Sequence, residues 1–239
     1  MIADMLPGDW PSDSWAVIGL SLKVGLVAVT ATTPVAFLLA WILARWRFPL
    51  KILLDALVHL PLIVPPVVTG WLLLILFGAN GPVGRFLAAQ FGITLLFRWT
   101  GAALAAAIMA LPLMVRAMRL SIEAVDRRLE QAAETLGAGR LRIFATISLP
   151  LAAPGILVAF ILGFARSLGE FGATITFVSD IPGETRTLPI AIYSSLQMPG
   201  GETGAAWFAL MSILLSMGAL LLSGLLARRV GWRRIDHVL

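Results

Sequence analysis

The stretch RAMRLSIEAVDRRLEQAAETLGAGRLRIFATI, residues 116–147, decides the fold, because it is a charged segment between two strongly apolar runs. The flanking runs are Trp99–Val115 and Pro150–Leu168, and each is long enough, or nearly so, to cross a bilayer as a helix. The insert itself carries six arginines. Basic connections between apolar runs are typical of a membrane protein with several spans.

The composition of the whole chain indicates the same class. Of its 239 residues 59% are apolar and 13% charged, and the mean hydropathy is +0.93, whereas an ordinary soluble domain has roughly a quarter charged residues. A shorter piece, Phe86–Phe97, contains Gly92 and is too short to span, so we interpret it as interfacial or re-entrant. We expect an all-α integral membrane protein, a single domain over residues 1–239, with about five transmembrane helices, or six if residues 86–97 span. The other three apolar runs are Trp15–Ala44, Leu50–Phe77 and Ala205–Ala227.

The basic residues are distributed unevenly among the connections. If residues 116–147, the connection after the first run and the C-terminal tail share one side, that side carries thirteen Lys and Arg against four on the other. Because basic connections are retained in the cytoplasm, we expect the N-terminus outside, the C-terminus inside and residues 174–204 outside. Lys23 lies within the first run, where we expect its side chain to reach the outer interface.

The sequence lacks the residues that several classes of function need. The chain has no cysteine and only two histidines, so thiolate metal sites and cysteine nucleophiles are excluded. Asp55 and His59 share a helical face, but two ligands without a third make a weak metal site, and a polar contact at a helix or subunit interface is the better interpretation. This pair is also the only candidate for an intramembrane enzyme. We therefore expect no catalytic residue, no metal and no cofactor, and the position of the basic residues between apolar runs argues against a nucleic-acid partner.

The insert has an internal pattern of its own. Residues Ser121–Leu136 favour a helix, residues 137–139 read Gly-Ala-Gly and interrupt it, and a second short helix follows that runs into Pro150. This pattern alone fits an amphipathic loop lying on anionic lipid equally well. The apolar positions that share one face of the first helix are Leu129, Ala133 and Leu136.

The detailed spacing resembles the cytoplasmic signature of ABC importer permeases, E-A-A-x3-G-x9-I-x-L-P. Residues 131–133, Gly137 and residues 147–150 match six of its seven specified positions, with Gln131 in place of Glu. Glu130 is adjacent but about 100° away around a helix, so it does not occupy the same face. In that family the segment forms a coupling helix that docks into an ATPase subunit. The coupling residues that the resemblance implies are Glu130, Gln131, Ala132, Ala133, Gly137, Ala138, Gly139 and Arg140. The chain contains no G-x4-G-K-[ST] loop, so ATP hydrolysis is expected in a separate subunit.

Two further segments indicate a pathway through the membrane. Pro61, Pro65 and Pro66 lie inside the second apolar run, where they remove backbone donors and are expected to break the helix. At the end of the fourth run, Arg166 and Glu170 are four residues apart, which fits an ion pair that closes the helix or part of an outer gate. The candidate pathway and gate residues are Pro65, Pro66, Arg166, Ser167, Glu170, Thr174 and Thr176. Arg166 and Arg186 are expected to bias the outer mouth toward anions, and Leu188–Leu196 to form a short interfacial helix.

The same segments carry a more specific resemblance. DALVHLPLIVPPVV (55–68) and FVSDIPGETRTLP (177–189) look like the permease family of molybdate ABC importers, whereas ARSLGEFGATITF (165–177) is also similar in sulfate permeases. The resemblance implies a type I importer fold in the bacterial inner membrane and a homodimer with two ATPase subunits. It also implies an extracytoplasmic binding protein that delivers molybdate, and tungstate as well. Sulfate, thiosulfate or another oxyanion is the alternative substrate.

Overall fold

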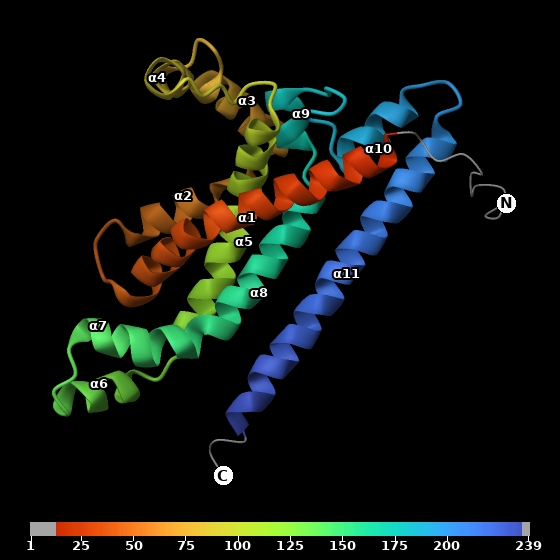
Figure 1. Cartoon of the computed structure of the whole chain (residues 1–239). Helices are drawn as coiled ribbons and strands as arrows, with labels where there is room; N and C mark the ends of the chain where they lie inside the picture. The colour runs from red at the N-terminus through yellow and green to blue at the C-terminus, as the bar shows by residue number, and fades with distance from the viewer. Residues whose placement is uncertain (1–12, 236–239) are drawn as a thin grey trace.

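The computed structural model describes residues 13–235, with side chains described except at 223 and 226–235. Helices make up nearly all of this part of the chain (Figure 1). In chain order the elements are α1 Ser14–Arg45, α2 Lys51–Ile63, α3 Pro66–Phe77, α4 Pro82–Phe91, α5 Trp99–Glu123, α6 Arg127–Thr135, α7 Arg140–Ile143, the π-helical turn η2 Phe144–Ser148, α8 Leu149–Leu168, α9 Gly172–Val178, α10 Leu188–Leu196 and α11 Glu202–Ile235.

The membrane-crossing elements agree with the expectation of about five spans. Four helices are long and apolar enough to cross: α1, α5, the continuous helix Arg140–Leu168 and the part of α11 up to Leu222. The pair α2 and α3 passes the same criterion as one span broken by a bend of 112°. The helix α4 has ten residues, about 15 Å of rise, which is too short to span.

The predicted break in the second span lies at Val64 and Pro65. Both residues are extended, with ψ of 137° and 135°, because each precedes a proline whose ring disfavours helical conformation in the residue before it. Pro66 then occupies the first turn of α3, where a missing N–H removes no helical hydrogen bond. Pro61 is accommodated inside α2.

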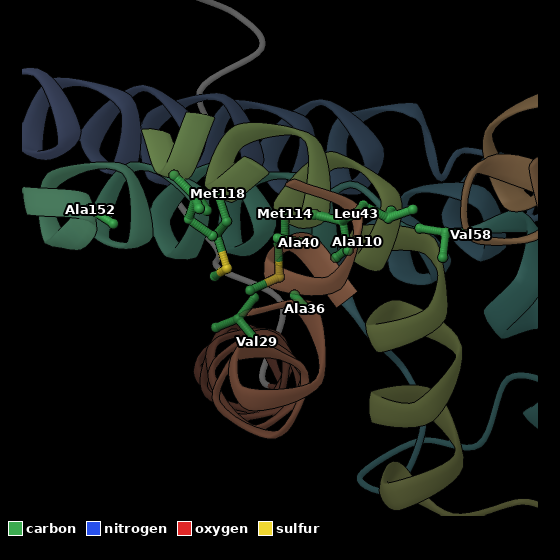
Figure 2. Packing of buried hydrophobic residues seen from close by; sticks show 12 residues of the cluster. Val29, Ala36, Ala40, Leu43, Val58, Ala110, Met114, Met118 and Ala152 are labelled. Carbon is green, nitrogen blue, oxygen red and sulfur yellow. The ribbon is translucent and has the colours of Figure 1, made fainter. Parts of the chain in front are cut away.

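The core forms where α1 and α8 pack against α5. Met114 and Met118 of α5 lie close to Val29 and Ala36 of α1 (Figure 2), and all four are buried. Gly163 of α8 allows a close approach, because an added Cβ would lie 2.6 Å from the Met114 sulfur. Small residues at such contacts are the usual means by which membrane helices pack closely.

The structure places α6 and α7 at one end of the molecule and α9 and α10 at the other (Figure 1). The helix α10, whose bounds match the predicted Leu188–Leu196, is tied to α1 because the Leu188 N–H donates to Ser21 Oγ at 2.8 Å. Lys23 of α1 places its ammonium 3.7 Å from the centre of the Trp99 ring, at the start of α5. A cation above an aromatic face is attracted by the negative face of the ring.

The insert differs from its expected form at one place. The predicted helix Ser121–Leu136 is wrong as a single element, because α5 continues to Glu123 and α6 begins only at Arg127. Asp126 starts the new helix, since its side chain accepts a hydrogen bond from the Arg128 N–H at 2.9 Å. The second short helix, α7, runs through η2 into α8 without a break, as its sequence indicated.

Candidate coupling and gate regions

The turn after α6 explains the Gly-Ala-Gly interruption. Gly137 has φ of +83°, a left-handed conformation that side chains with a Cβ rarely adopt. Its N–H donates to the Glu134 carbonyl, and the next N–H, of Ala138, donates to the Ala133 carbonyl, both at 3.0 Å. These bonds satisfy carbonyls at the end of the helix, so Gly137 ends α6 and redirects the chain into α7.

Large apolar side chains project from the insert into solvent. Leu136 is 88% exposed, Leu141 81% and Leu129 50%, whereas Ala133 and Ala138 are half-buried. Large exposed apolar side chains of this kind are candidates for contact with another protein or with lipid. The remaining predicted coupling residues, Gln131, Ala132, Gly139 and Arg140, are also exposed.

Glu130 differs from the other predicted coupling residues because it points toward the membrane helices. Its Oε1 lies 2.7 Å from Arg45 Nη2 of α1 and accepts a 2.7 Å hydrogen bond from Ser148 Oγ. This contact leaves no signal in the sequence, because Arg45 is 85 residues away and no local pattern links the two.

At the opposite end, the predicted ion pair between Arg166 and Glu170 is present. Arg166 Nη1 lies 2.8 Å from Glu170 Oε2, and the Glu170 side chain is 2% exposed. The other oxygen, Oε1, accepts a 2.9 Å hydrogen bond from the Ala173 N–H. Glu170 therefore joins the end of α8 to the first turn of α9, and this double use satisfies a carboxylate that would otherwise be costly to bury.

The proline break lies directly against α9. A Cβ added to Gly172 would be 2.8 Å from Pro66 Cβ, and one added to Gly70 would be 2.6 Å from the Ala173 carbonyl oxygen and 2.8 Å from Thr176 Cβ. The α3 and α9 backbones are thus in close contact. The structure thus brings Pro66 next to Gly172, and Gly70 next to Thr176, although these residues are far apart in sequence.

Two of the three hydroxyl-bearing candidates, Ser167 and Thr176, are held by their own helices. Ser167 Oγ donates to the Gly163 carbonyl at 2.9 Å, and Thr176 Oγ1 donates to the Gly172 carbonyl at 2.8 Å. Ser167 and Thr174 are buried, at 7% and 2% exposure, whereas Thr176 is half-buried. Within a single chain, Thr176 is the most accessible of the three.

Asp55 and His59 form the polar helix contact that the sequence indicated. His59 Nδ1 lies 3.3 Å from Asp55 Oδ1, and Arg119 Nη1 of α5 lies 3.3 Å from the same carboxylate. Arg119 also bonds Glu123 at 2.8 Å, so the group ties α2 to the end of α5. Among residues 13–235, no three His, Cys, Asp or Glu side chains are grouped to hold a metal.

Arg186, which was expected to bias the outer mouth toward anions, is paired with two carboxylates. Its guanidinium donates two hydrogen bonds to Asp180, at 2.8 and 3.1 Å, and lies 3.7 Å from Asp13. The hydrogen bond to Asp180 raises the pKa of Arg186, and Asp180 also accepts a short hydrogen bond from Ser194. Two carboxylates thus neutralise this charge, and it serves to hold the loop between α9 and α10.

Residues 34–232 match the family described as binding-protein-dependent transport system inner membrane component. The chain belongs to this family. It is therefore a multi-pass inner-membrane permease component of a transport system that uses a binding protein, and it is not an enzyme.

Similar proteins in several bacteria share most of its length. It is 59% identical over 214 residues, covering 90% of this chain and 93% of the relative, to the molybdenum transport system permease protein ModB of Escherichia coli strain K12. The corresponding protein of Haemophilus influenzae is 52% identical, with 90% and 94% coverage. The sulfate transport system permease protein CysT of Salmonella typhimurium is 38% identical, with 93% and 79% coverage.

Solved structures confirm the fold expected for an ABC importer permease. A bacterial alginate ABC transporter chain, crystallised in complex with an alginate-bound periplasmic protein, superimposes with a TM-score of 0.72 at 17% identity. The match covers 92% of the permease and 80% of that chain. The MetNI methionine ABC transporter gives a TM-score of 0.66 at 16% identity, with 90% and 93% coverage.

Proposed function

We propose that this permease carries molybdate, and also tungstate, into the cytoplasm as the membrane-spanning part of an ATP-driven importer. The observation that carries the proposal is its 59% identity to a molybdenum transport permease over 90% of the chain, against 38% to a sulfate transport permease. Tungstate is included because its size and charge are nearly those of molybdate.

The proposed assembly contains two copies of this chain, two ATPase subunits and an extracytoplasmic oxyanion-binding protein. About five spans from one chain enclose little space, so a pathway between two copies related by a twofold axis is the physical expectation. Residues 116–147 are proposed as the cytoplasmic coupling segment within one membrane domain. Their exposed Leu129, Leu136 and Leu141 supply the apolar surface that an ATPase subunit would cover.

The proposed topology has the N-terminus outside and the C-terminus in the cytoplasm. It is supported by the thirteen-to-four distribution of basic residues. The positions of α6 with α7, and of α9 with α10, at opposite ends of the molecule are consistent with it (Figure 1).

The proposed pathway passes the contact between the proline break and α9. A divalent oxyanion faces a barrier of tens of kcal/mol in hydrocarbon, so it needs a shielded aqueous route. Pro65 and Pro66 fix the bend, and Glu170 with Arg166 fixes the start of α9. Ser167, Thr174 and Thr176 remain candidates for the pathway, while strong oxyanion recognition is assigned to the binding protein.

Uptake into proteoliposomes tests the substrate. The permease is reconstituted with its ATPase and binding protein, and ATP-dependent entry of labelled molybdate, tungstate and sulfate is compared at equal concentrations. We expect molybdate and tungstate to enter and to compete with each other, with sulfate a poor competitor. ATP-dependent sulfate entry that excess molybdate does not inhibit would refute the proposal.

Sulfate or thiosulfate import is the second candidate. It is favoured by the 38% identity to a sulfate transport permease over 224 residues. Deletion of the chain distinguishes the two. Loss of molybdenum-dependent enzyme activity at limiting molybdate supports the first function, and impaired sulfate uptake with that activity unchanged supports the second.

A further inference from the structure

We propose that Glu130 is a positioning residue that ties α6 to the ends of two membrane helices, so that movement of the coupling segment is transmitted to the membrane domain. This inference rests on the proposed function of residues 116–147 as the coupling segment. It assigns to one side chain the link between the docking surface and the helices that must move.

The geometry is a bridge through one oxygen atom. Glu130 Oε1 accepts hydrogen bonds from Arg45 Nη2 and from Ser148 Oγ, each at 2.7 Å. Arg45 is the last residue of α1, and Ser148 is the last residue of η2, directly before α8. The contact therefore joins α6 to two helices that pack against α5 in the core.

The bridge lies in a sheltered site, where its strength is greatest. The side chains of Arg45 and Glu130 are 11% and 21% exposed, and Ser148 is 2% exposed. Hydrogen bonds between charged groups are shorter and stronger than neutral ones, and reduced contact with water strengthens them further.

Arg45 depends on Glu130 for its pairing. The Arg45 guanidinium lies 5.6 Å from the centre of the Trp41 ring, and Trp41 contacts the Phe144 ring edge-on at 5.0 Å. The Arg45 Nε is buried and has no hydrogen-bond partner within the described part of the chain. Removal of the Glu130 carboxylate would thus leave a sheltered cation without an opposite charge, which is strongly unfavourable.

The rest of α6 offers little alternative attachment. None of its residues is buried, and its large apolar side chain Leu129 faces solvent. A helix of nine residues is not stable through its own hydrogen bonds alone. Its orientation is therefore set by its few contacts with α7 and η2, by the chain connections at its two ends and by the Glu130 bridge.

The π-helical turn places Ser148 at the bridge. Phe144 and Ser148 are the two ends of η2, and both line a hollow of about 580 Å³ together with Trp41, Arg45 and Glu130. Single π turns within longer helices are frequent at functional sites. Here the turn presents an aromatic ring to Trp41 and a hydroxyl to Glu130 from the same short segment.

The test measures attachment and coupling separately. A spin label at Arg128→Cys, in an otherwise cysteine-free chain, reports the mobility of α6 in the assembled transporter. Import of molybdate per ATP hydrolysed reports coupling. The variants are Glu130→Ala and Glu130→Gln, with Glu134→Gln as the matched control, because Glu134 lies one turn along α6, is exposed and has no side-chain partner among the described residues.

We expect Glu130→Ala to raise label mobility and to lower import per ATP by about tenfold, since a hydrogen bond to a charged group contributes about that factor or more. Glu130→Gln keeps an oxygen acceptor but loses the charge. Its label mobility and its import per ATP are expected to lie between those of Glu130→Ala and the wild type. The exchange Arg45→Glu with Glu130→Arg restores the opposite charges and is expected to recover part of the coupling. Glu134→Gln, which leaves the bridge to Arg45 and Ser148 intact, is expected to match the wild type in label mobility.

Three results would overturn the inference. They are unchanged import per ATP in Glu130→Ala, an equal rise of label mobility in Glu134→Gln, and failure of the charge exchange to improve on the single variants. A wild-type transporter that imports no molybdate would instead overturn the proposed function, and the label mobility would still report whether Glu130 holds α6. If Glu130→Ala fails to assemble, Glu130→Gln and the charge exchange provide the same comparison.

Discussion

Replacing Glu170 by alanine tests how the end of α8 is joined to α9. The Glu170 side chain is 2% exposed and bonds Arg166 Nη1 at 2.8 Å. It also accepts the Ala173 N–H at 2.9 Å. Glu170→Ala removes both interactions at once and adds no bulk to the site.

The expected loss of stability follows from these contacts. A hydrogen bond that involves a charged group contributes about 1.5–3 kcal/mol, and Arg166, at 29% exposure, regains part of its hydration when its partner is lost. We expect Glu170→Ala to lower the free energy of unfolding by about 2–3 kcal/mol. Since 1 kcal/mol corresponds to about 2–4 °C for a chain of this size, the melting temperature should fall by about 4–12 °C.

Thermal unfolding of the detergent-solubilised permease measures the effect, with the fluorescence of its eight tryptophans as the signal. Glu170→Gln keeps an acceptor for the Ala173 N–H and is expected to lose about half as much stability. Glu134→Gln, at an exposed position, is the control and should melt as the wild type does. A Glu170→Ala protein with the wild-type melting temperature would show that the ion pair and the cap do not stabilise this junction.

Three further predictions concern topology, coupling and packing. In intact cells, an impermeant thiol reagent should label a single cysteine at position 184 (Glu184→Cys) but not one at position 128 (Arg128→Cys). Gly137→Leu, which forces a side chain into φ of +83° at about 1–2 kcal/mol, should reduce copurification of the ATPase and lower transport. Gly70→Val, whose Cβ would lie 2.6 Å from the Ala173 carbonyl oxygen, should separate α3 from α9 and lower the free energy of unfolding by about 1–3 kcal/mol in thermal unfolding.

Each of these predictions has a matched control and a contrary outcome. Labelling of position 128 in intact cells would show that residues 116–147 lie outside and that the proposed topology is inverted. Gly200→Leu, at φ of +75° and with nothing within 4 Å of an added Cβ, imposes similar backbone strain outside residues 116–147 and should leave copurification of the ATPase unchanged. Unchanged transport in Gly137→Leu would remove Gly137 from the coupling surface. Gly19→Ala, with no atom within 4 Å of its new Cβ, is the control for the packing prediction. A Gly70→Val protein as stable as the wild type would contradict the close contact of α3 and α9.

Features that depend on local sequence were predicted well. The spans follow from the length of the apolar runs, and the break at Val64 and Pro65 follows from prolines that restrict the residues before them. The end of α6 at Gly137 was also predictable, because Gly-Ala-Gly at residues 137–139 is a local signal for a turn. The boundary between α5 and α6 was missed, although Asp126 is a favourable residue at a helix start, because helix-forming residues on both sides concealed it.

Features that depend on distant residues could not be predicted. The charge of Arg186 was expected to face an anion, but its neutralisation depends on how the loop folds to bring Asp180 and Asp13 within reach. The second role of Glu170, as acceptor for the first turn of α9, depends on the bend that follows α8. Neither arrangement leaves a periodic or compositional signal.

The sequence by itself determined which segments cross the membrane, where the second span breaks and which insert carries the importer signature. Apolar length, proline geometry and residue spacing act within a single segment, so these features need no knowledge of neighbouring helices. Only the tertiary structure decided that Pro66 lies against Gly172 and that Glu130 bridges Arg45 and Ser148. The physical reason is that hydrogen bonds, ion pairs and close backbone contacts act over a few ångströms, and helix packing alone determines which distant residues come that close.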